Sequence, residues 1–121
     1  MCGILGIYNV KKEPIHRGTF TNMLDKIAHR GPDGEGFAAL PLEQGRVAAF
    51  GHRRLSIIDL SGGDQPMTSH DGRFTVIFNG EIYNFEEIRK QLSKEISICW
   101  KTDHSDTEVI IQAYLYWGIS C

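Results

Sequence analysis

Apolar side chains recur along the chain with spacings that separate strands from helices. Residues 3–10 (GILGIYNV) are rich in β-branched and aromatic side chains without helical spacing, which predicts a buried strand. In residues 73–78 (RFTVIF), Phe74, Val76 and Phe78 alternate onto one face, which predicts a second strand. Further strands are expected near residues 37–40, across 47–60 as one strand with a break or two short ones, and around 96–100.

Three segments have apolar residues at the 3.6-residue spacing of helices that bury one face. The predicted helices cover residues 19–30, about 85–93, and the stretch from Ser105 to Gly118. Gly31-Pro32 ends the first, and the other two begin with capping-box spacings, Asn84 with Glu87 and Ser105 with Glu108. The apolar side of the third helix is expected to hold Val109, Ile110, Ala113, Tyr114 and Trp117.

Composition indicates one ordinary globular domain, or part of one, because the 121 residues are 41% hydrophobic and 23% charged without repeats or linkers. The net charge is -2 and no dense basic stretch occurs, so neither nucleic acid nor an anionic membrane is an expected partner. The chain has neither the pattern of a secretory signal nor an apolar run of spanning length. We therefore expect a cytoplasmic protein.

The cysteines and histidines do not indicate a metal site or a disulfide framework. Cys2, Cys99 and Cys121 are widely spaced and form no CxxC pair. Cys99 and Cys121 are expected to have no role beyond packing, and His29 and His52 are expected to make structural hydrogen bonds. Without a Walker motif, ATP binding by this chain is not expected either. We predict no cofactor for these residues.

Cys2 follows Met1 directly, which gives it a candidate chemical role. If Met1 is removed, Cys2 carries both a thiol nucleophile and a free α-amine that is neutral often enough near pH 7 to accept the thiol proton. No separate catalytic histidine is then needed. The plainer interpretation is that a small residue near a chain end serves no catalytic purpose, and Cys2 alone does not decide between the two.

Asn79-Gly80 follow the strand predicted over 73–78. A side-chain amide and an unobstructed backbone N–H at this point could stabilise an oxyanion, as a thiolate attacking a carboxamide requires. The same dipeptide is more often a hairpin turn. Glu81, the next residue, could equally be a turn carboxylate.

Arg53 and Arg54 lie in a strand-like stretch, so their side chains should alternate and at most one can serve a given carboxylate ligand. A strand arginine is more often part of a solvated face. Asp106, within the predicted capping box, has the ordinary role of complementing the positive end of a helix.

Together these residues resemble a known family. The chain carries, in order, MCGI, HRGPDG (29–34), GHRRLSIIDLSGGDQPM (51–67), NGEIYN (79–84) and SDTEVI (105–110). This order is similar to that of class II glutamine amidotransferase domains, in particular the glutaminase half of glutamine-dependent asparagine synthetases. The resemblance implies an α+β fold, the N-terminal-nucleophile αββα sandwich of two stacked, mainly antiparallel sheets between helices.

The resemblance also implies a role for each matching residue, with L-glutamine as the substrate. Cys2 would attack the side-chain amide, Asn79 and Gly80 would form the oxyanion hole, and Arg54 would bind the α-carboxylate. The remaining implied contacts are the backbone of Leu55, Ser56, Ile57 and Ile58 along the pocket, and Glu81 and Asp106 on the α-ammonium group.

Domains of this family continue beyond the helix that ends here near Trp117, and a synthetase domain that uses ATP and magnesium follows. We therefore expect residues 1–121 to be the N-terminal part of a glutaminase domain, incomplete at its C-terminus, with the synthetase domain or the further segment as its partner. The oligomeric state is left open, a homo-oligomer included.

Glutamine hydrolysis to glutamate and ammonia is the leading functional interpretation, with the ammonia passed to a synthetase domain. One alternative is a catalytically silent remnant that at most binds glutamine or a partner. Another is an N-terminal-nucleophile hydrolase that acts on a different amide.

Overall fold

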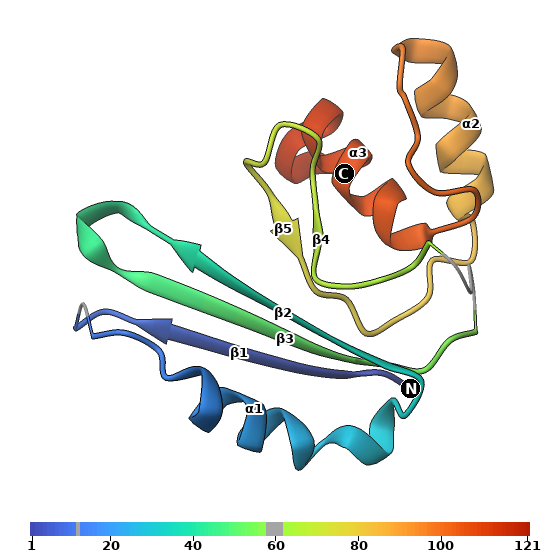
Figure 1. Ribbon diagram of the computed structural model, residues 1–121. Helices are drawn as coiled ribbons and strands as arrows, with labels where there is room; N and C mark the ends of the chain where they lie inside the picture. The colour runs from blue at the N-terminus through green and yellow to red at the C-terminus, as the bar shows by residue number, and fades with distance from the viewer. Residues whose placement is uncertain (12, 58–61) are drawn as a thin grey trace.

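Two antiparallel sheets lie between helices in this fold (Figure 1). The computed structural model describes residues 1–11, 13–57 and 62–121. Its strands are β1 (Gly3–Asn9), β2 (Gly34–Pro41), β3 (Val47–Arg54), β4 (Met67–Thr68) and β5 (Thr75–Val76). Its helices are α1 (Arg17–Asp25), α2 (Phe85–Glu95) and α3 (Asp106–Trp117), with 3-10 turns at Ala28–Arg30, Glu43–Gly45 and Gly118–Ser120. The predicted α+β class, with sheets stacked between helices, is confirmed.

The first sheet has the order β1-β3-β2, and its register brings the start of the chain to the end of β3. Gly3 pairs with Arg53, and Gly34 pairs with Arg54, so β1 and β2 both begin beside the end of the central strand. The strand predicted over residues 3–10 is therefore present, and it holds the N-terminal residues against β3.

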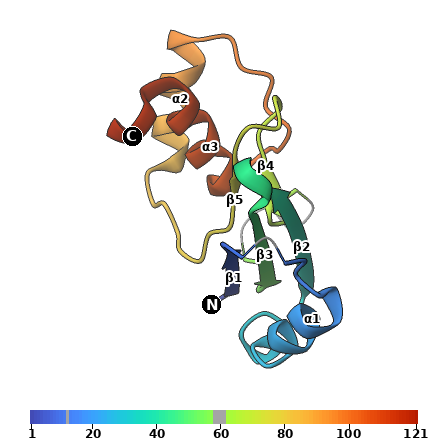
Figure 2. The ribbon, with the colours of Figure 1, turned by 90° about the vertical axis from the view of Figure 1, so that its left-hand side faces the viewer.

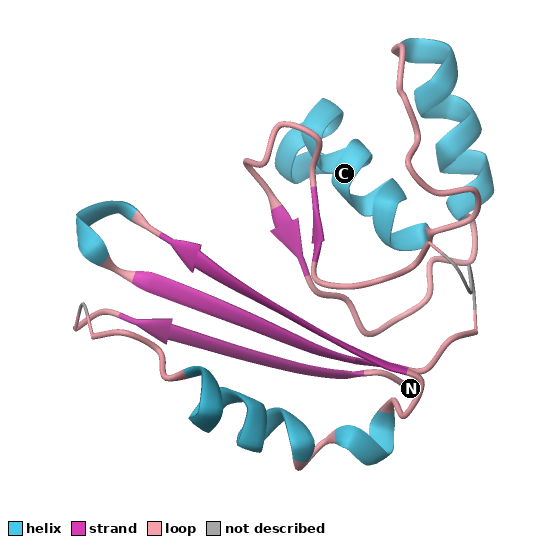
Figure 3. Cartoon of the chain, in the orientation of Figure 1, coloured by secondary structure: helices cyan, strands magenta, loops and turns pink. Residues whose placement is uncertain are grey.

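Helix α1 covers one face of this sheet (Figure 3). Phe20 and Leu24 are its buried residues, and they pack on Gly51 of β3. An added Cβ at Gly51 would lie 2.6 Å from the Phe20 ring, so only glycine allows this close approach. The contact leaves the opposite face of β3 turned toward the second sheet.

Arg53 and Arg54 point to opposite faces, as the strand pattern predicted. Arg53 forms ion pairs with Asp25 of α1 and with Glu35 of β2, the latter at 2.8 Å. Arg54 lies on the other face together with the buried His52, and this face borders the cavity described below.

The second sheet is much shorter than the apolar pattern predicted. Among the described residues of the strand expected over 73–78, only Thr75 and Val76 belong to a strand, and they pair with β4. Met67 of β4 had been expected to lie in a loop. Side chains supplement the ladder on both sides. Ser69 donates its N–H to the Phe74 carbonyl oxygen at 2.9 Å, and its Oγ accepts from the Phe74 N–H. At the other end, Gln65 Oε1 accepts from the Phe78 N–H. Helices α3 and α2 lie on the far side of this sheet from α1 (Figure 2).

The first predicted helix is shorter at its end than the apolar spacing indicated. Helix α1 ends at Asp25, and a separate 3-10 turn at Ala28–Arg30 leads to Gly31. An added Cβ at Gly31 would lie 2.3 Å from the Arg53 carbonyl oxygen. The chain leaves the helix early because this turn has to bring Gly31 against the backbone of β3.

Only one of the two expected capping boxes forms its cap. Ser105 Oγ accepts from the Glu108 N–H at 3.4 Å, which confirms the start of α3, whereas the Asn84 side chain makes no capping hydrogen bond on α2.

Val109 and Ala113 of α3 are buried as expected, but Tyr114 is exposed. The remaining buried residues of α3 extend around its first half: Asp106, Thr107, Glu108, Ile111 and Gln112.

The strand expected around 96–100 is wrong, since no described strand pairs with these residues. Trp100 instead receives the Arg89 guanidinium 4.0 Å from its ring centroid and donates to Ser93 Oγ. Cys99 and Cys121 are both exposed, so neither packs in the core. Among the described residues, none of the helices has the length and apolar character needed to cross a membrane.

Gly36 of β2 offers a test of how the two sheets are joined, because an added Cβ there would lie 1.8 Å from the Gln65 carbonyl oxygen. We predict that Gly36→Ala destabilises the fold by about 1–3 kcal/mol, since the strand and the loop must separate. Gly6→Ala is the matched control, because its Cβ would first meet Phe50 at 3.9 Å. Urea unfolding measures both, and equal stability of the two variants would contradict the contact.

Candidate active site

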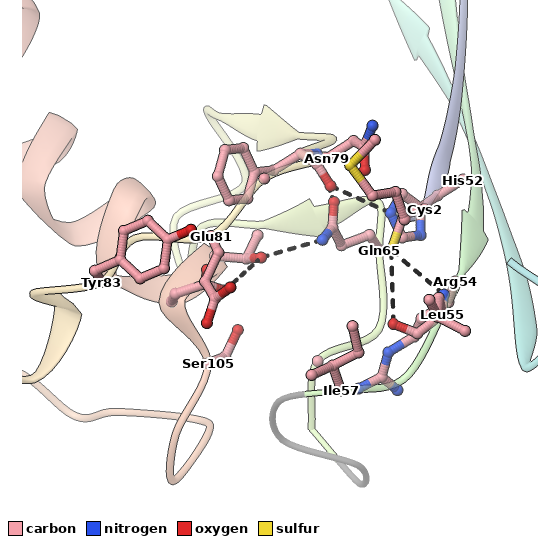
Figure 4. A pocket seen from close by; sticks show the side chains of 16 residues that line it. Cys2, His52, Arg54, Leu55, Ile57, Gln65, Asn79, Glu81, Tyr83 and Ser105 are labelled. Atoms are coloured by element: carbon pink, nitrogen blue, oxygen red, sulfur yellow. Dashed lines mark hydrogen bonds between the residues drawn. The ribbon is translucent and has the colours of Figure 1, made fainter. Parts of the chain in front are cut away.

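A cavity of about 300 Å³ opens where the end of the first sheet meets the second sheet and α3 (Figure 4). Most of the residues singled out in the sequence line it: Cys2, Arg54, Leu55, Ile57, Asn79, Gly80, Glu81 and Asp106. Ser56 is not among the lining residues, and Ile58 lies outside the described residues. The fold thus gathers groups from four separate motifs at one place.

Cys2 is half-buried and held against the residue that follows β3. The Leu55 N–H donates to Cys2 Sγ at 3.3 Å, and Sγ lies 3.7 Å from the Leu55 carbonyl oxygen. Arg30 Nε donates to the Cys2 carbonyl oxygen at 3.1 Å. Contacts on both its backbone and its sulfur therefore orient the thiol at the cavity wall.

The HRGPDG loop supports this wall from behind. The Asp33 N–H donates to the Arg54 carbonyl oxygen at 3.0 Å, and Asp33 Oδ2 accepts from the Ser56 N–H at 2.8 Å. The loop therefore fixes the backbone on both sides of Leu55. This contact with Asp33 is what Ser56 contributes to the site.

Arg54 supplies a buried cation to the cavity. Only 10% of its side chain is exposed, and Nη1 lies 3.0 Å from Oδ1 of Asp64, whose own side chain is 88% exposed. The guanidinium group is thus already presented to a carboxylate that reaches it from the solvent side. A carboxylate of a small ligand would meet the same donor geometry.

Asn79, Gly80 and Glu81 form the opposite wall, directly after Phe78. The Phe78 carbonyl oxygen accepts from His52 Nε2 at 3.3 Å, and its N–H donates to Gln65 Oε1 at 2.5 Å. Figure 4 shows Asn79 and Cys2 among the labelled residues that line the cavity.

Asp106 brings the first turn of α3 to the same cavity. Its Oδ2 accepts from the Ile82 N–H at 3.2 Å, which ties α3 to the segment that follows Glu81. Asp103, the neighbouring acidic residue, is exposed and lies instead in a separate groove beside α2. The site therefore combines the buried guanidinium group of Arg54 with the carboxylates of Glu81 and Asp106. These are the charges needed to bind the two ends of a free amino acid.

Sequence reasoning missed Gln65 as a site residue, although it lies inside the SGGDQPM motif. His52 was expected to make a structural hydrogen bond, and its bond to Phe78 confirms this. Tyr83 and Thr107 also line the cavity without having been singled out. No group of three His, Cys, Asp or Glu side chains among the described residues is arranged to hold a metal ion.

The sequence is similar to known proteins over its whole length. A sequence model of the glutamine amidotransferase domain matches residues 1–121. Asparagine synthetases [glutamine-hydrolyzing] 3 and 1 of Bacillus subtilis are 37% and 39% identical over 100% and 97% of this chain. Amidase chry2 of Gibberella zeae is 40% identical over 80% of it. The chain spans only 19%, 18% and 14% of these three relatives, respectively.

His52 allows a prediction on the pH dependence of stability. Burial lowers its pKa below the ordinary value of 6.5, the hydrogen bond to Phe78 opposes this, and Arg54 lowers it further. The unfolded chain therefore binds a proton at higher pH than the folded chain, so stability should fall as the pH drops below about 6.5.

Replacing His52 with Gln removes this titration, so the stability of His52→Gln should decline less than that of the parent protein between about pH 7 and pH 5. Urea unfolding across this range measures the difference. Parallel declines of the two proteins would show that His52 does not contribute.

Proposed function

The chain belongs to the glutamine amidotransferase domain family, and on this premise we propose that the cavity binds L-glutamine and that Cys2 hydrolyses it to glutamate and ammonia. The observation that carries the proposal is the convergence of Cys2, Arg54, Asn79 and Asp106 on one cavity. A thiol, a cation, an amide donor and a carboxylate are the groups that a reaction on the side-chain amide of a free amino acid requires.

The mechanism begins with removal of Met1, which leaves the α-amine on the residue that carries the thiol. The amine takes the thiol proton as the sulfur attacks the amide carbon of glutamine. The Asn79 side-chain amide and the Gly80 N–H stabilise the oxyanion that forms. The amine then returns the proton to the departing nitrogen, so ammonia leaves and a glutamyl thioester remains. Water adds to the thioester, releases glutamate and restores the thiol.

Recognition of the substrate uses the charged groups at its two ends. Arg54 binds the α-carboxylate, and Glu81 and Asp106 receive the α-ammonium group. Leu55 and Ile57, both on the cavity wall, support the proposed contact along the aliphatic part of the substrate. An amide that lacks either charged end would lose its contact with Arg54 or with the two carboxylates and be a poor substrate.

The relatives suggest where the ammonia goes, since two of them are named glutamine-hydrolysing asparagine synthetases. We propose that residues 1–121 are the N-terminal part of a glutaminase domain that supplies ammonia to an ATP-dependent synthetase-type domain. ATP and magnesium would be bound by that partner domain. A cytoplasmic location stays a prediction.

The similarity to a protein named an amidase supports a second candidate function, hydrolysis of a different amide. The same nucleophile and oxyanion donors would serve that reaction. The presence of Arg54 and of the carboxylates of Glu81 and Asp106 on one cavity favours a free amino acid over other amides. Competition between glutamine and simple amides separates the two candidates.

Covalent labelling by a diazoketone analogue of glutamine tests the proposed nucleophile. We expect the natural protein to lose Met1 and to be alkylated at Cys2 alone, with glutamine protecting it. The exposed Cys99 and Cys121 are internal controls, because they should react with iodoacetamide but not with the analogue. Peptide mass spectrometry locates the label. Labelling that glutamine does not slow, or none at Cys2, would contradict the proposal and favour a silent domain.

The two neighbouring arginines provide a matched pair of variants that tests substrate recognition. Arg54→Gln should raise the KM for glutamine by about 10–100-fold, because a hydrogen bond to a charged group contributes about 1.5–3 kcal/mol. Arg53→Gln removes ion pairs to Asp25 and Glu35 on the opposite face, so it should lower stability and leave KM nearly unchanged. Steady-state glutaminase kinetics of both variants test this, and equal effects on KM would refute the role of Arg54.

A further inference from the structure

The backbone of Phe78 is held on both sides by side chains rather than by a neighbouring strand. Strand β5 ends at Val76, two residues earlier. The Phe78 N–H donates to Gln65 Oε1 at 2.5 Å, and its carbonyl oxygen accepts from His52 Nε2 at 3.3 Å. The two residues that follow, Asn79 and Gly80, are the proposed oxyanion donors, so these bonds act immediately before them.

His52 is firmly placed and its tautomer follows from its contacts. It is 1% exposed and lies in the central strand β3, where it pairs with Ile4 on one side and Gly36 on the other. A carbonyl oxygen can only accept, so Nε2 must carry the hydrogen. Nδ1 is buried without a hydrogen-bond partner among the described residues, which fits a neutral ring protonated on Nε2 alone.

Gln65 joins the same backbone to two other parts of the fold. Its Nε2 donates to Thr107 Oγ1 at 3.1 Å, in the first turn of α3 beside Asp106. Its own carbonyl oxygen packs on Gly36 of β2 so closely that no Cβ fits there. One side-chain amide thus connects Phe78 to α3, while its backbone rests on the first sheet.

We propose that His52 and Gln65 are positioning residues that fix the backbone of Phe78 and so aim Asn79 and Gly80 at the amide that Cys2 attacks. The inference rests on the proposed glutaminase function and assigns a task to two residues for which the family resemblance implied none. Oxyanion donors act only when they are held in place before the reaction, and a displacement of about 1 Å can cost about 100-fold in rate. Loss of either residue should therefore affect kcat more than KM.

The test compares variants of the natural full-length protein. His52→Leu should lower kcat for glutamine hydrolysis by about 10–100-fold and change KM by less than about threefold. His52→Gln, whose side-chain N–H can take the place of Nε2–H, should recover most of the loss. Gln65→Leu is an independent variant that should also lower kcat. The double variant of His52→Leu and Gln65→Leu should lower kcat by less than the product of the two single-variant factors, because both residues act through Phe78.

Ser69→Ala is the matched control. It removes a similar side-chain bond to the backbone, the Phe74 N–H to Ser69 Oγ bond at 3.1 Å, from the turn at the other end of the second sheet. Ser69 does not line the cavity. This variant should lower stability and keep kcat within about twofold of the parent value. A loss of kcat as large as that of His52→Leu would mean that kcat follows general stability, which would overturn the proposal.

Amide hydrogen exchange gives a readout besides activity. Exchange at residues 78–80 should become faster in His52→Leu and Gln65→Leu and should be restored in His52→Gln. Unchanged exchange in both leucine variants would refute the positioning of Phe78, whatever the activity. A parent protein that neither hydrolyses glutamine nor reacts with the diazoketone would instead refute the proposed function and the catalytic part of this inference.

Discussion

The antiparallel pairing of β1 with β3 is the constraint on which the site depends. The register that sets Gly3 opposite Arg53 leaves Cys2 beside Leu55, whose N–H lies 3.3 Å from the sulfur. A slip of one residue would turn every side chain of β1 to the other face. Helix α1 packs on the same sheet, where the Phe20 ring fits only over a glycine at position 51 of β3. The position of the candidate nucleophile is therefore a consequence of the β1–β3 register.

The opposite wall of the cavity is stabilised in a different way. Buried backbone polar groups need partners, and a two-residue ladder supplies few of them. The side chains of Gln65, Ser69 and His52 meet this need around the second sheet. Because each bond comes from one side chain, single substitutions can change this wall, whereas the β1–β3 wall depends on a whole register. The two walls also meet through Gln65 and Gly36, so site geometry and domain stability are coupled.

The sequence predicted those features that single segments determine locally. The strand at β1, the cap at Ser105 and the opposite directions of Arg53 and Arg54 each follow from periodicity or from one side chain. Features that need a partner were predicted poorly. Residues 73–78 alternate as a strand, yet only Thr75 and Val76 pair with another strand. Residues 96–100 pair with no described strand.

The candidate site shows the same division. The family motifs named its candidate residues, and most of them line the cavity. The exceptions are Ser56, which contacts Asp33 instead, and Ile58, which lies outside the described residues. The supporting bonds of His52 and Gln65 join positions 26 and 13 residues apart in the sequence. No local pattern indicates such a pairing, because an isolated histidine or glutamine has many ordinary roles. Tertiary structure was needed to find them.

The charge arrangement around Arg54 is compatible with the proposed binding of a substrate carboxylate beside a buried cation. A guanidinium group that is only 10% exposed would be costly without a negative partner. Asp64 provides this negative partner, but its side chain is 88% exposed. An ion pair so exposed to water contributes at most about 1 kcal/mol to stability. An incoming carboxylate can replace Asp64 at little cost, because the displaced side chain is already solvated. In the proposed binding step, exchange of one carboxylate for another would leave Arg54 with a negative partner both before and after the substrate binds.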